Sequence, residues 1–438
     1  MRRIADLPTP WRYLAIGLLA LVVLAILIWI DRDPPTEGTI TLHVKLHARA
    51  PLPAGAIHPL FHHLPRGTSD ARAEWIALDV PSDRVAEDLV ELAGQPGVDA
   101  AFVAPDAVLA GAALPDEPDR CPITTPSYES YQGYVGPAPA GIDAPAAWRI
   151  GVRGAGVWFA DVEGNWNAAH EDLPGDRITH AGGTLIRDVS WRQHGTAVLG
   201  EVVGRDNGLG VVGLAPDVDR VFTSSIGDTS VADAIDTAAE ALRPGDVLLI
   251  ELQSTGPRGR FLPVEYWEDS YDAIRAATDR GIVVIEAAGN GGENLDHRAY
   301  RGKLDRTKRD SGAIMVGAGG PPRDGFTDRA RLDFSNYGAR VDVQGWGRRV
   351  ATLDYGDLQR CAGSDRHYTG QFSGTSSASP IVAGAAVLLE SYARRSGAPL
   401  APAEVRRLLA TTGTPQTGNT REHIGPRPDL ARALGELR

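Results

Sequence analysis

The sequence predicts an α/β fold in which a parallel sheet carries helices on both faces. From Val157 onward, short apolar runs alternate with longer amphipathic segments. Runs this short are strands rather than helices, and continuous apolar strands are typical of parallel sheets that are buried on both faces. The alternation of the two kinds of segment indicates repeated βαβ units. With 438 residues and 43% hydrophobic content, the chain can form more than one domain around a sizeable core.

The elements of this sheet can be placed in order along the chain. We expect strands over residues 157–161, 247–250, 282–285 and 314–316. We expect helices over residues 230–242, 264–279 and 402–410. This order places helices between successive strands, which is the connection that a parallel sheet needs.

One serine lies at the start of a buried helix. The segment Gly374-Thr-Ser-Ser-Ala-Ser-Pro380 is followed at once by the apolar run 381–389, which is long enough to be a core helix. Pro380 is tolerated in the first helical turn because its missing N–H is not needed there. Ser376 therefore lies near backbone N–H groups and the positive end of a helix dipole, where a developing oxyanion is stabilised. Taken alone, the pattern also fits an ordinary capped helix start.

A base and a carboxylate for this serine are present upstream. We expect His194 to open a second apolar helix, and Asp161 to stand at the carboxyl end of a buried strand, where open α/β sheets place their sites. Each residue alone has an ordinary structural explanation, such as a capping carboxylate or a core histidine. Together with Ser376 they predict a nucleophile, its base and the group that orients the base.

The chain order Asp161, His194, Ser376 resembles that of the subtilisin-like serine proteases, the subtilases, with Gly-Thr after the histidine and before the nucleophile. Four further segments resemble family motifs: 141–148, 212–216, 287–291 and 334–338. The similarity extends over about residues 141 to 436. The resemblance implies a serine endopeptidase that forms an acyl-enzyme and requires no cofactor for catalysis. It also implies that Asn290 is the side-chain donor of the oxyanion hole.

Several positions depart from the family pattern. After the aspartate the family usually has Thr/Ser-Gly, whereas here Val162-Glu163-Gly164 follows. The strand that lines the primary specificity pocket commonly reads Ser-Leu-Gly in the family. The corresponding candidates for substrate binding here are Gln253, Ser254, Thr255 and Gly256, so the family's substrate preference does not transfer. Structural calcium is common in subtilases, but no local run matches a defined calcium loop, and the metal site stays unassigned.

Two other functions remain open. The first is a catalytically inactive subtilase-like domain that binds peptides, which is disfavoured because all three triad residue types and the asparagine are present. The second is another acyl hydrolase on the same scaffold. The Gly-x-Ser-x-Gly motif of α/β-hydrolases is absent around Ser376, because Ala378 stands two residues after it.

The N-terminal residues predict a membrane anchor. Residues 13–30 are an uninterrupted apolar stretch, just long enough to span a bilayer, and Arg2, Arg3 and Arg12 precede it. No small-x-small cleavage site follows. We therefore expect an uncleaved signal anchor with residues 1–12 in the cytoplasm. The catalytic part of this single-pass cell-membrane protein would then lie outside the cytoplasm.

Residues 37–108 predict a small α+β domain. Strand patterns over 39–46, 74–80 and 98–103 surround a helix that Ser82 would cap and that runs to about residue 93. By pattern and position this domain resembles the inhibitory propeptide of subtilases, which would make it an intramolecular inhibitor; an unrelated domain is the alternative. Residues 109–139, rich in Ala, Pro, Gly and Asp, are expected to be a linker. Autocleavage is expected between about residues 107 and 116, and the peptidase domain over 140–438.

Two cysteines and the net charge complete the prediction. Outside the cytoplasm we expect Cys121 and Cys361 to form a disulfide, which can persist there; two unpaired buried thiols are the alternative. The formal net charge of -12 argues against nucleic acid as a partner. Peptides or proteins are the expected substrates.

Overall fold

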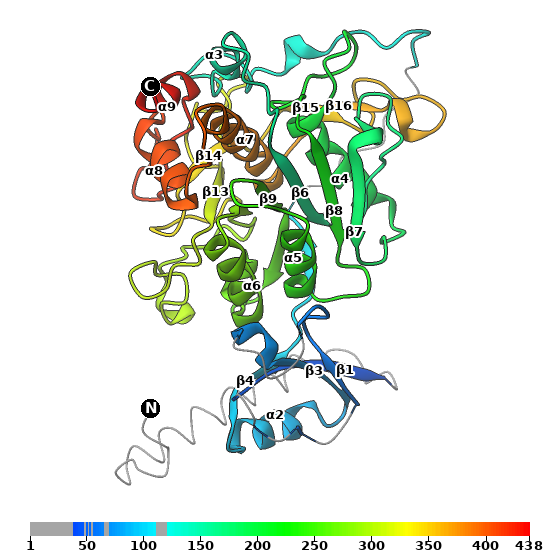
Figure 1. Ribbon diagram of the computed structural model, residues 1–438, viewed down its shortest axis with the longest axis vertical. Helices are drawn as coiled ribbons and strands as arrows, with labels where there is room; N and C mark the ends of the chain where they lie inside the picture. The colour runs from blue at the N-terminus through cyan, green and yellow to red at the C-terminus, as the bar shows by residue number, and fades with distance from the viewer. Residues whose placement is uncertain (1–37, 48–49, 51, 54–55, 65–69, 111–120) are drawn as a thin grey trace. The chain divides into compact units, whose positions relative to one another are not determined.

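The computed structural model describes residues 38–47, 50, 52–53, 56–64, 70–110 and 121–438. The chain divides into two compact units, residues 1–104 and 105–438 (Figure 1). The predicted membrane anchor, residues 13–30, lies outside the described residues. Within the described ranges, no helix has the length and apolar character that crossing a membrane requires.

The first unit is an antiparallel sheet with one helix. The strands β2 (Ala56–Pro59), β3 (Trp75–Pro81), β1 (Thr39–Leu46) and β4 (Val98–Val103) are neighbours in that order. Helix α2 (Val85–Gly94) packs on β3 and β4 and buries Val85 and Leu92 against strand residues such as Leu42. The three predicted strands are confirmed, and β2 is an additional one. The predicted cap at Ser82 is wrong, because the residue before the helix is Arg84.

The second unit is built on a seven-stranded parallel sheet (Figure 1). Its strands are, in spatial order, β14 (Val343–Trp346), β13 (Ile314–Gly319), β12 (Val283–Ala287), β9 (Val247–Ile250), β6 (Trp158–Glu163), β8 (Arg220–Ser225) and β7 (Ile178–Gly182). The four predicted strands correspond to β6, β9, β12 and β13, and the parallel arrangement is confirmed. The central strands are largely apolar and almost entirely buried, since helices cover both of their faces.

The helices of this unit lie in two groups. Helix α4 (Val189–Val203) packs on α7 (Ser379–Arg395) over one face of the sheet, and α5 (Val231–Glu240) packs on α6 (Glu268–Asp279) over the other (Figure 1). The predicted helices correspond to α5, to α6 and to α8 (Pro402–Thr412). Short helices α3 (Ala144–Trp148) and α9 (Leu430–Glu436) pack against each other, and α9 also contacts α7. Strands β15 (Val350–Leu353) and β16 (Tyr368–Phe372) form a hairpin against α4.

A small antiparallel sheet completes the second unit. It consists of β11 (Phe261–Pro263), β10 (Leu252–Thr255) and β5 (Ala107–Leu109), with β10 in the middle. Strand β5 therefore belongs to the second unit, although the sequence analysis predicts residues 107–108 to be part of the preceding domain. The predicted linker 109–139 is also not free of structure: Tyr134, near its end, is completely buried in the core of the second unit.

Candidate active site

Ser376 lies in the short 3-10 turn Thr375–Ser377, directly before α7. Pro380 stands in the first turn of α7, as the sequence predicts. The turn opens at Gly374, whose φ of 119° is one that only glycine adopts without strain. Ser376 is fully buried, and its Oγ has no hydrogen-bond partner among the described residues. Its position at the entrance of a buried helix is therefore confirmed.

His194 lies inside α4 rather than at its start. The helix begins at Val189, and the Asp188 carboxylate caps it by accepting the Ser190 N–H at 2.7 Å. The prediction that His194 opens a helix is wrong for this reason. Its imidazole packs edge-on against Phe372, with ring centroids 5.3 Å apart. Among the described residues Nε2 has no hydrogen-bond partner, while Nδ1 has one.

The carboxylate on His194 Nδ1 is Glu163, not Asp161. The Nδ1–Oε1 distance is 2.5 Å, and both side chains are buried. Strand β6 continues beyond the apolar run to Glu163, so Asp161 is not the residue at its carboxyl end. Asp161 Oδ2 instead accepts the indole N–H of Trp166 at 2.7 Å. The predicted contact between Asp161 and the histidine is therefore not present as a hydrogen bond among the described residues, and Glu163, which the sequence analysis did not name as a site residue, makes that bond instead.

Burial dominates the electrostatics of these three groups. It raises the pKa of Asp161 and of Glu163 well above their usual values, and at Asp161 the Glu163 carboxylate adds to the effect. Burial lowers the pKa of His194 to about 3, although the charge of the Asp161 carboxylate raises this pKa and so opposes the effect of burial. A positive charge on His194 is therefore costly unless a nearby carboxylate is ionised, and Glu163 is the carboxylate in direct contact.

The side chain of Asn290 is oriented by Thr375. Its Oδ1 accepts the Thr375 N–H at 2.9 Å and the Thr375 hydroxyl at 3.1 Å. Because the oxygen is occupied in this way, Nδ2 is the atom that remains to donate. It donates to the carbonyl oxygen of Ala110, and the Ser376 N–H points to the same oxygen at 3.4 Å. Asn290 and Ser376 thus converge on one carbonyl, as an oxyanion hole requires.

Strand β5 brings this carbonyl into the site. It pairs with β10 in the register Leu252 with Leu109, Gln253 with Val108 and Ser254 with Ala107. The backbone of residues 107–110 is therefore extended beside β10, and it ends with the Ala110 carbonyl between two donors. This is the arrangement that a peptide substrate adopts when it adds a strand to a sheet edge.

The four predicted substrate-binding residues have different surroundings. Gln253 donates through Nε2 to the Leu109 carbonyl at 2.8 Å and accepts the Asn290 N–H at 2.7 Å. Ser254 pairs with Ala107 of β5. Thr255 pairs with Phe261 of β11, and Gly256 lies in the turn that joins β10 to β11. Gln253 is the member of this set whose side chain contacts both β5 and Asn290.

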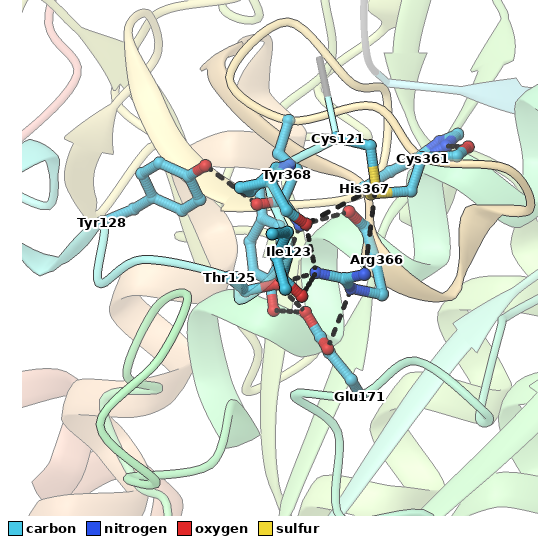
Figure 2. Close-up of a disulfide and its surroundings, with 11 residues drawn as sticks. Cys121, Ile123, Thr125, Tyr128, Glu171, Cys361, Arg366, His367 and Tyr368 are labelled. Carbon is cyan, nitrogen blue, oxygen red and sulfur yellow. Dashed lines mark hydrogen bonds and ion pairs between the residues drawn. A yellow bond between two sulfur atoms is a disulfide. The ribbon is translucent and has the colours of Figure 1, made fainter. Parts of the chain in front are cut away.

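The predicted disulfide is confirmed, since Cys121 and Cys361 are bonded (Figure 2). Arg366 links its surroundings: it donates to the Pro122 carbonyl at 3.0 Å and to Thr125 Oγ1 at 3.2 Å, and it forms an ion pair with Glu171 at 3.4 Å (Figure 2). The disulfide and these polar contacts thereby attach the segment that begins at Cys121 to the rest of the second unit.

Within the described ranges, no group of three or more His, Cys, Asp or Glu side chains is arranged to hold a metal ion. Calcium binding, which the family resemblance allows, is not tested by this finding and stays open.

The model of the subtilase family matches residues 167–425, which is more than half of the chain. The chain therefore belongs to the subtilase family. Glu163 and Asp161 lie just before the matched range. The fold agrees, with a TM-score of 0.59 and 19% identity to the crystal structure of fervidolysin from Fervidobacterium pennivorans, over 92% of this chain and 62% of that one.

Individual relatives are distant in sequence. Subtilisin DY from Bacillus licheniformis is 30% identical over 278 residues, which are 60% of this chain and 86% of that protein. Subtilisin Savinase from Lederbergia lenta is 28% identical over 265 residues, 57% of this chain and 81% of that protein. An alkaline protease from Alkalihalobacillus alcalophilus is also 28% identical, but the chain spans only 58% of its length.

Proposed function

We propose that this chain hydrolyses peptide bonds outside the cytoplasm through an acyl-enzyme on Ser376. The observation that carries the proposal is the Ala110 carbonyl, which accepts hydrogen bonds from Asn290 Nδ2 and the Ser376 N–H at the end of a strand paired with β10. Donors that converge on a carbonyl next to a buried serine are suited to stabilise the oxyanion of acyl transfer.

The residues divide the reaction between them. Ser376 Oγ attacks the carbonyl carbon, and His194 Nε2 takes the hydroxyl proton and gives it to the leaving amine. Glu163 holds the imidazole through Nδ1 and stabilises the imidazolium that forms, a role usually held by aspartate in this family. Water then attacks the acyl-enzyme by the same route in reverse and releases the free carboxylate. Asp161 acts only at a distance, through its charge.

The first substrate, in this proposal, is the chain itself. The carbonyl in the oxyanion hole belongs to Ala110, so the bond that is positioned for attack joins Ala110 to Gly111. This position lies inside the interval 107–116 that the sequence predicts. After cleavage, residues 107–110 would remain paired with β10 as a product, and the preceding domain would act as an intramolecular inhibitor until it dissociates.

Cleavage at this bond would also separate the enzyme from the predicted membrane anchor. Cys121 and its disulfide lie on the C-terminal side of the cut, so no covalent bond would link the catalytic unit to residues 1–110. In this proposal the full chain is a single-pass membrane protein, and maturation releases its catalytic unit.

Expression of wild type and Ser376→Ala, followed by membrane and soluble fractionation without reductant, tests the proposal. We expect soluble wild-type enzyme whose N-terminal sequence begins at Gly111, which labels with a fluorophosphonate and digests casein. We expect Ser376→Ala to remain full length in the membrane. Labelling without casein digestion would favour another acyl hydrolase, and an active enzyme that stays full length would refute autocleavage.

A further inference from the structure

Gln253 stands where the family commonly has a serine, and its carboxamide is held from two sides. Its Oε1 accepts the Asn290 N–H at 2.7 Å, and its Nε2 donates to the Leu109 carbonyl at 2.8 Å. Because an N–H can only donate and a carbonyl can only accept, the orientation of the amide is fixed. The first partner, Asn290, also binds the Ala110 carbonyl through its side chain, and the second partner, Leu109, directly precedes Ala110. The carboxamide therefore lies alongside residue 110.

The space next to β10 and Asn290 is filled by side chains of this chain. Gly256 and Gly289 both leave room there. A Cβ built on Gly256 would lie 2.3 Å from Leu262 Cδ1, and one built on Gly289 would lie 2.9 Å from Asn336 Nδ2 and 3.5 Å from Gln253 Oε1. Leu262 thus fills the volume beside Gly256, and Asn336 together with Gln253 fills the volume beside Gly289. Ala110 and Leu262 are both 0% exposed, and Gln253 is 3% exposed, so little room is left for a larger residue at position 110.

We propose that Gln253 determines specificity: its carboxamide fills the pocket for the residue before the scissile bond and limits that residue to the size of alanine. The same amide binds the carbonyl of the preceding substrate residue. A buried glutamine is costly unless its polar atoms are paired; here Oε1 is paired with the Asn290 N–H, whereas Nε2 has its partner only while an extended chain lies on β10. The role in turnover rests on the proposed function, but the fit around residue 110 does not.

Peptides with the sequence Ala-Val-Leu-Xaa before the scissile bond test the role in turnover. Processed wild type, Gln253→Ser and Gln253→Met are compared with Ala or Phe at Xaa. We expect wild type to prefer Ala by about 100-fold in kcat/KM or more. Gln253→Ser should reduce this preference to below about tenfold by admitting Phe. Gln253→Met keeps the volume but loses both hydrogen bonds, so it should cut kcat/KM about tenfold for either peptide and retain the preference.

An unchanged preference in Gln253→Ser, or a Met variant that accepts Phe as readily as the Ser variant, would overturn the proposal. If either result is found and the wild-type enzyme still cleaves casein, the specificity proposal fails and the proposed function stands.

A second experiment needs no catalysis. In the full chain carrying Ser376→Ala, hydrogen exchange of β5 and β10 is compared for Ala110→Phe with and without Gln253→Ser. We expect Ala110→Phe alone to accelerate exchange by at least about tenfold, since overpacking expels the strand. The added Gln253→Ser should restore protection. Full protection of Ala110→Phe with Gln253 present would contradict the steric role, whether or not the enzyme proves to be a peptidase.

Discussion

Glu163 and Asp161 are two residues apart on one strand, so their side chains point to the same face of the sheet. The sequence places a carboxylate there, but it does not tell which of the two reaches the histidine. That choice depends on where β6 ends and where α4 positions His194, both of which are tertiary features. The unusual Glu163, in the place where the family has Thr/Ser-Gly, is the signal in the sequence that a second carboxylate takes part.

Replacement of each carboxylate by its amide separates their roles. We expect Glu163→Gln to lower kcat by about 10⁴, the scale known for the orienting carboxylate of serine-protease triads, because the amide cannot stabilise the imidazolium. Asp161→Asn should cost less than about tenfold, since its amide oxygen can still accept the Trp166 N–H. Steady-state kinetics on a peptide substrate measures both. A larger loss in Asp161→Asn than in Glu163→Gln would restore the original assignment.

Asn290 gives a second prediction at the scale of single residues. We expect Asn290→Ala to lower kcat by about 10² to 10³ with KM nearly unchanged, because the oxyanion exists mainly in the transition state. Thr375→Val provides the matched control: it removes the hydroxyl bond to Asn290 Oδ1 but keeps the backbone bond, and it should have a smaller effect on kcat. A rise in KM at constant kcat would make Asn290 a substrate-binding residue instead.

Helix α4 shows what a single element contributes to the site. Its first five residues, Val189 to Gln193, are exposed or partly buried, and its last ten residues, from His194 onward, are buried. The apolar pattern marks only the buried part, which is why the sequence analysis begins the helix too late. The carboxylate of Asp188 at the cap is the local signal that would have corrected this boundary.

Removal of this cap should weaken the helix without altering the chemistry. Asp188→Ala is expected to lower the midpoint of thermal unfolding, because the Ser190 N–H loses its acceptor. Asp188→Ser should restore most of the loss, and kcat should change less than about twofold in both variants. Thermal unfolding in the Ser376→Ala chain avoids autolysis during the measurement. A decrease in kcat that Asp188→Ser does not reverse would show that the cap positions His194.

The other elements differ in how readily the sequence reveals them. The central strands β6, β9, β12 and β13 are buried and apolar, so short hydrophobic runs predict them. Strands β7 and β8 lie toward one edge of the sheet and mix polar with apolar residues, so they give no such run. Strand β5 has three residues, and its significance comes entirely from its pairing with β10. The scissile position therefore needs the structure, whereas the identity of Ser376 and His194 does not.

At the scale of the molecule, the core of the second unit contains buried acidic side chains. Glu201 of α4 and Glu251, which follows β9, are both 0% exposed. Burial raises the pKa of each well above its usual value; at Glu201 the Glu251 carboxylate adds to this, and at Glu251 the Ser379 hydroxyl opposes it. Neither oxygen of Glu201 has a hydrogen-bond partner among the described residues. Glu201 thus opposes folding more strongly when it is ionised than when it is protonated.

These acids give the stability of the molecule a pH dependence. The folded chain holds the Glu201 proton more tightly than the unfolded chain does, so stability is greatest below the unfolded pKa of about 4.3 and falls as pH rises toward the folded pKa. Glu201→Gln removes this contribution. We expect the unfolding midpoint of wild type to fall relative to the variant between pH 5 and pH 8, in the Ser376→Ala background. The exposed variant Glu129→Gln should show no such trend, and parallel curves for wild type and Glu201→Gln would contradict the prediction.

The pairing of β5 with β10 has a consequence for the behaviour of the molecule in solution. When residues 107–110 leave, β10 presents a row of unpaired backbone N–H and C=O groups, which can recruit any extended chain, including that of a second molecule. If the proposed maturation opens this edge, the active enzyme should therefore be more prone to self-association than the intact chain. In the intact chain, β5 covers this edge of β10. Light scattering at equal concentrations of two Ser376→Ala chains without the predicted anchor, one that begins at residue 38 and one that begins at residue 111, would show equal association if the exposed edge were harmless.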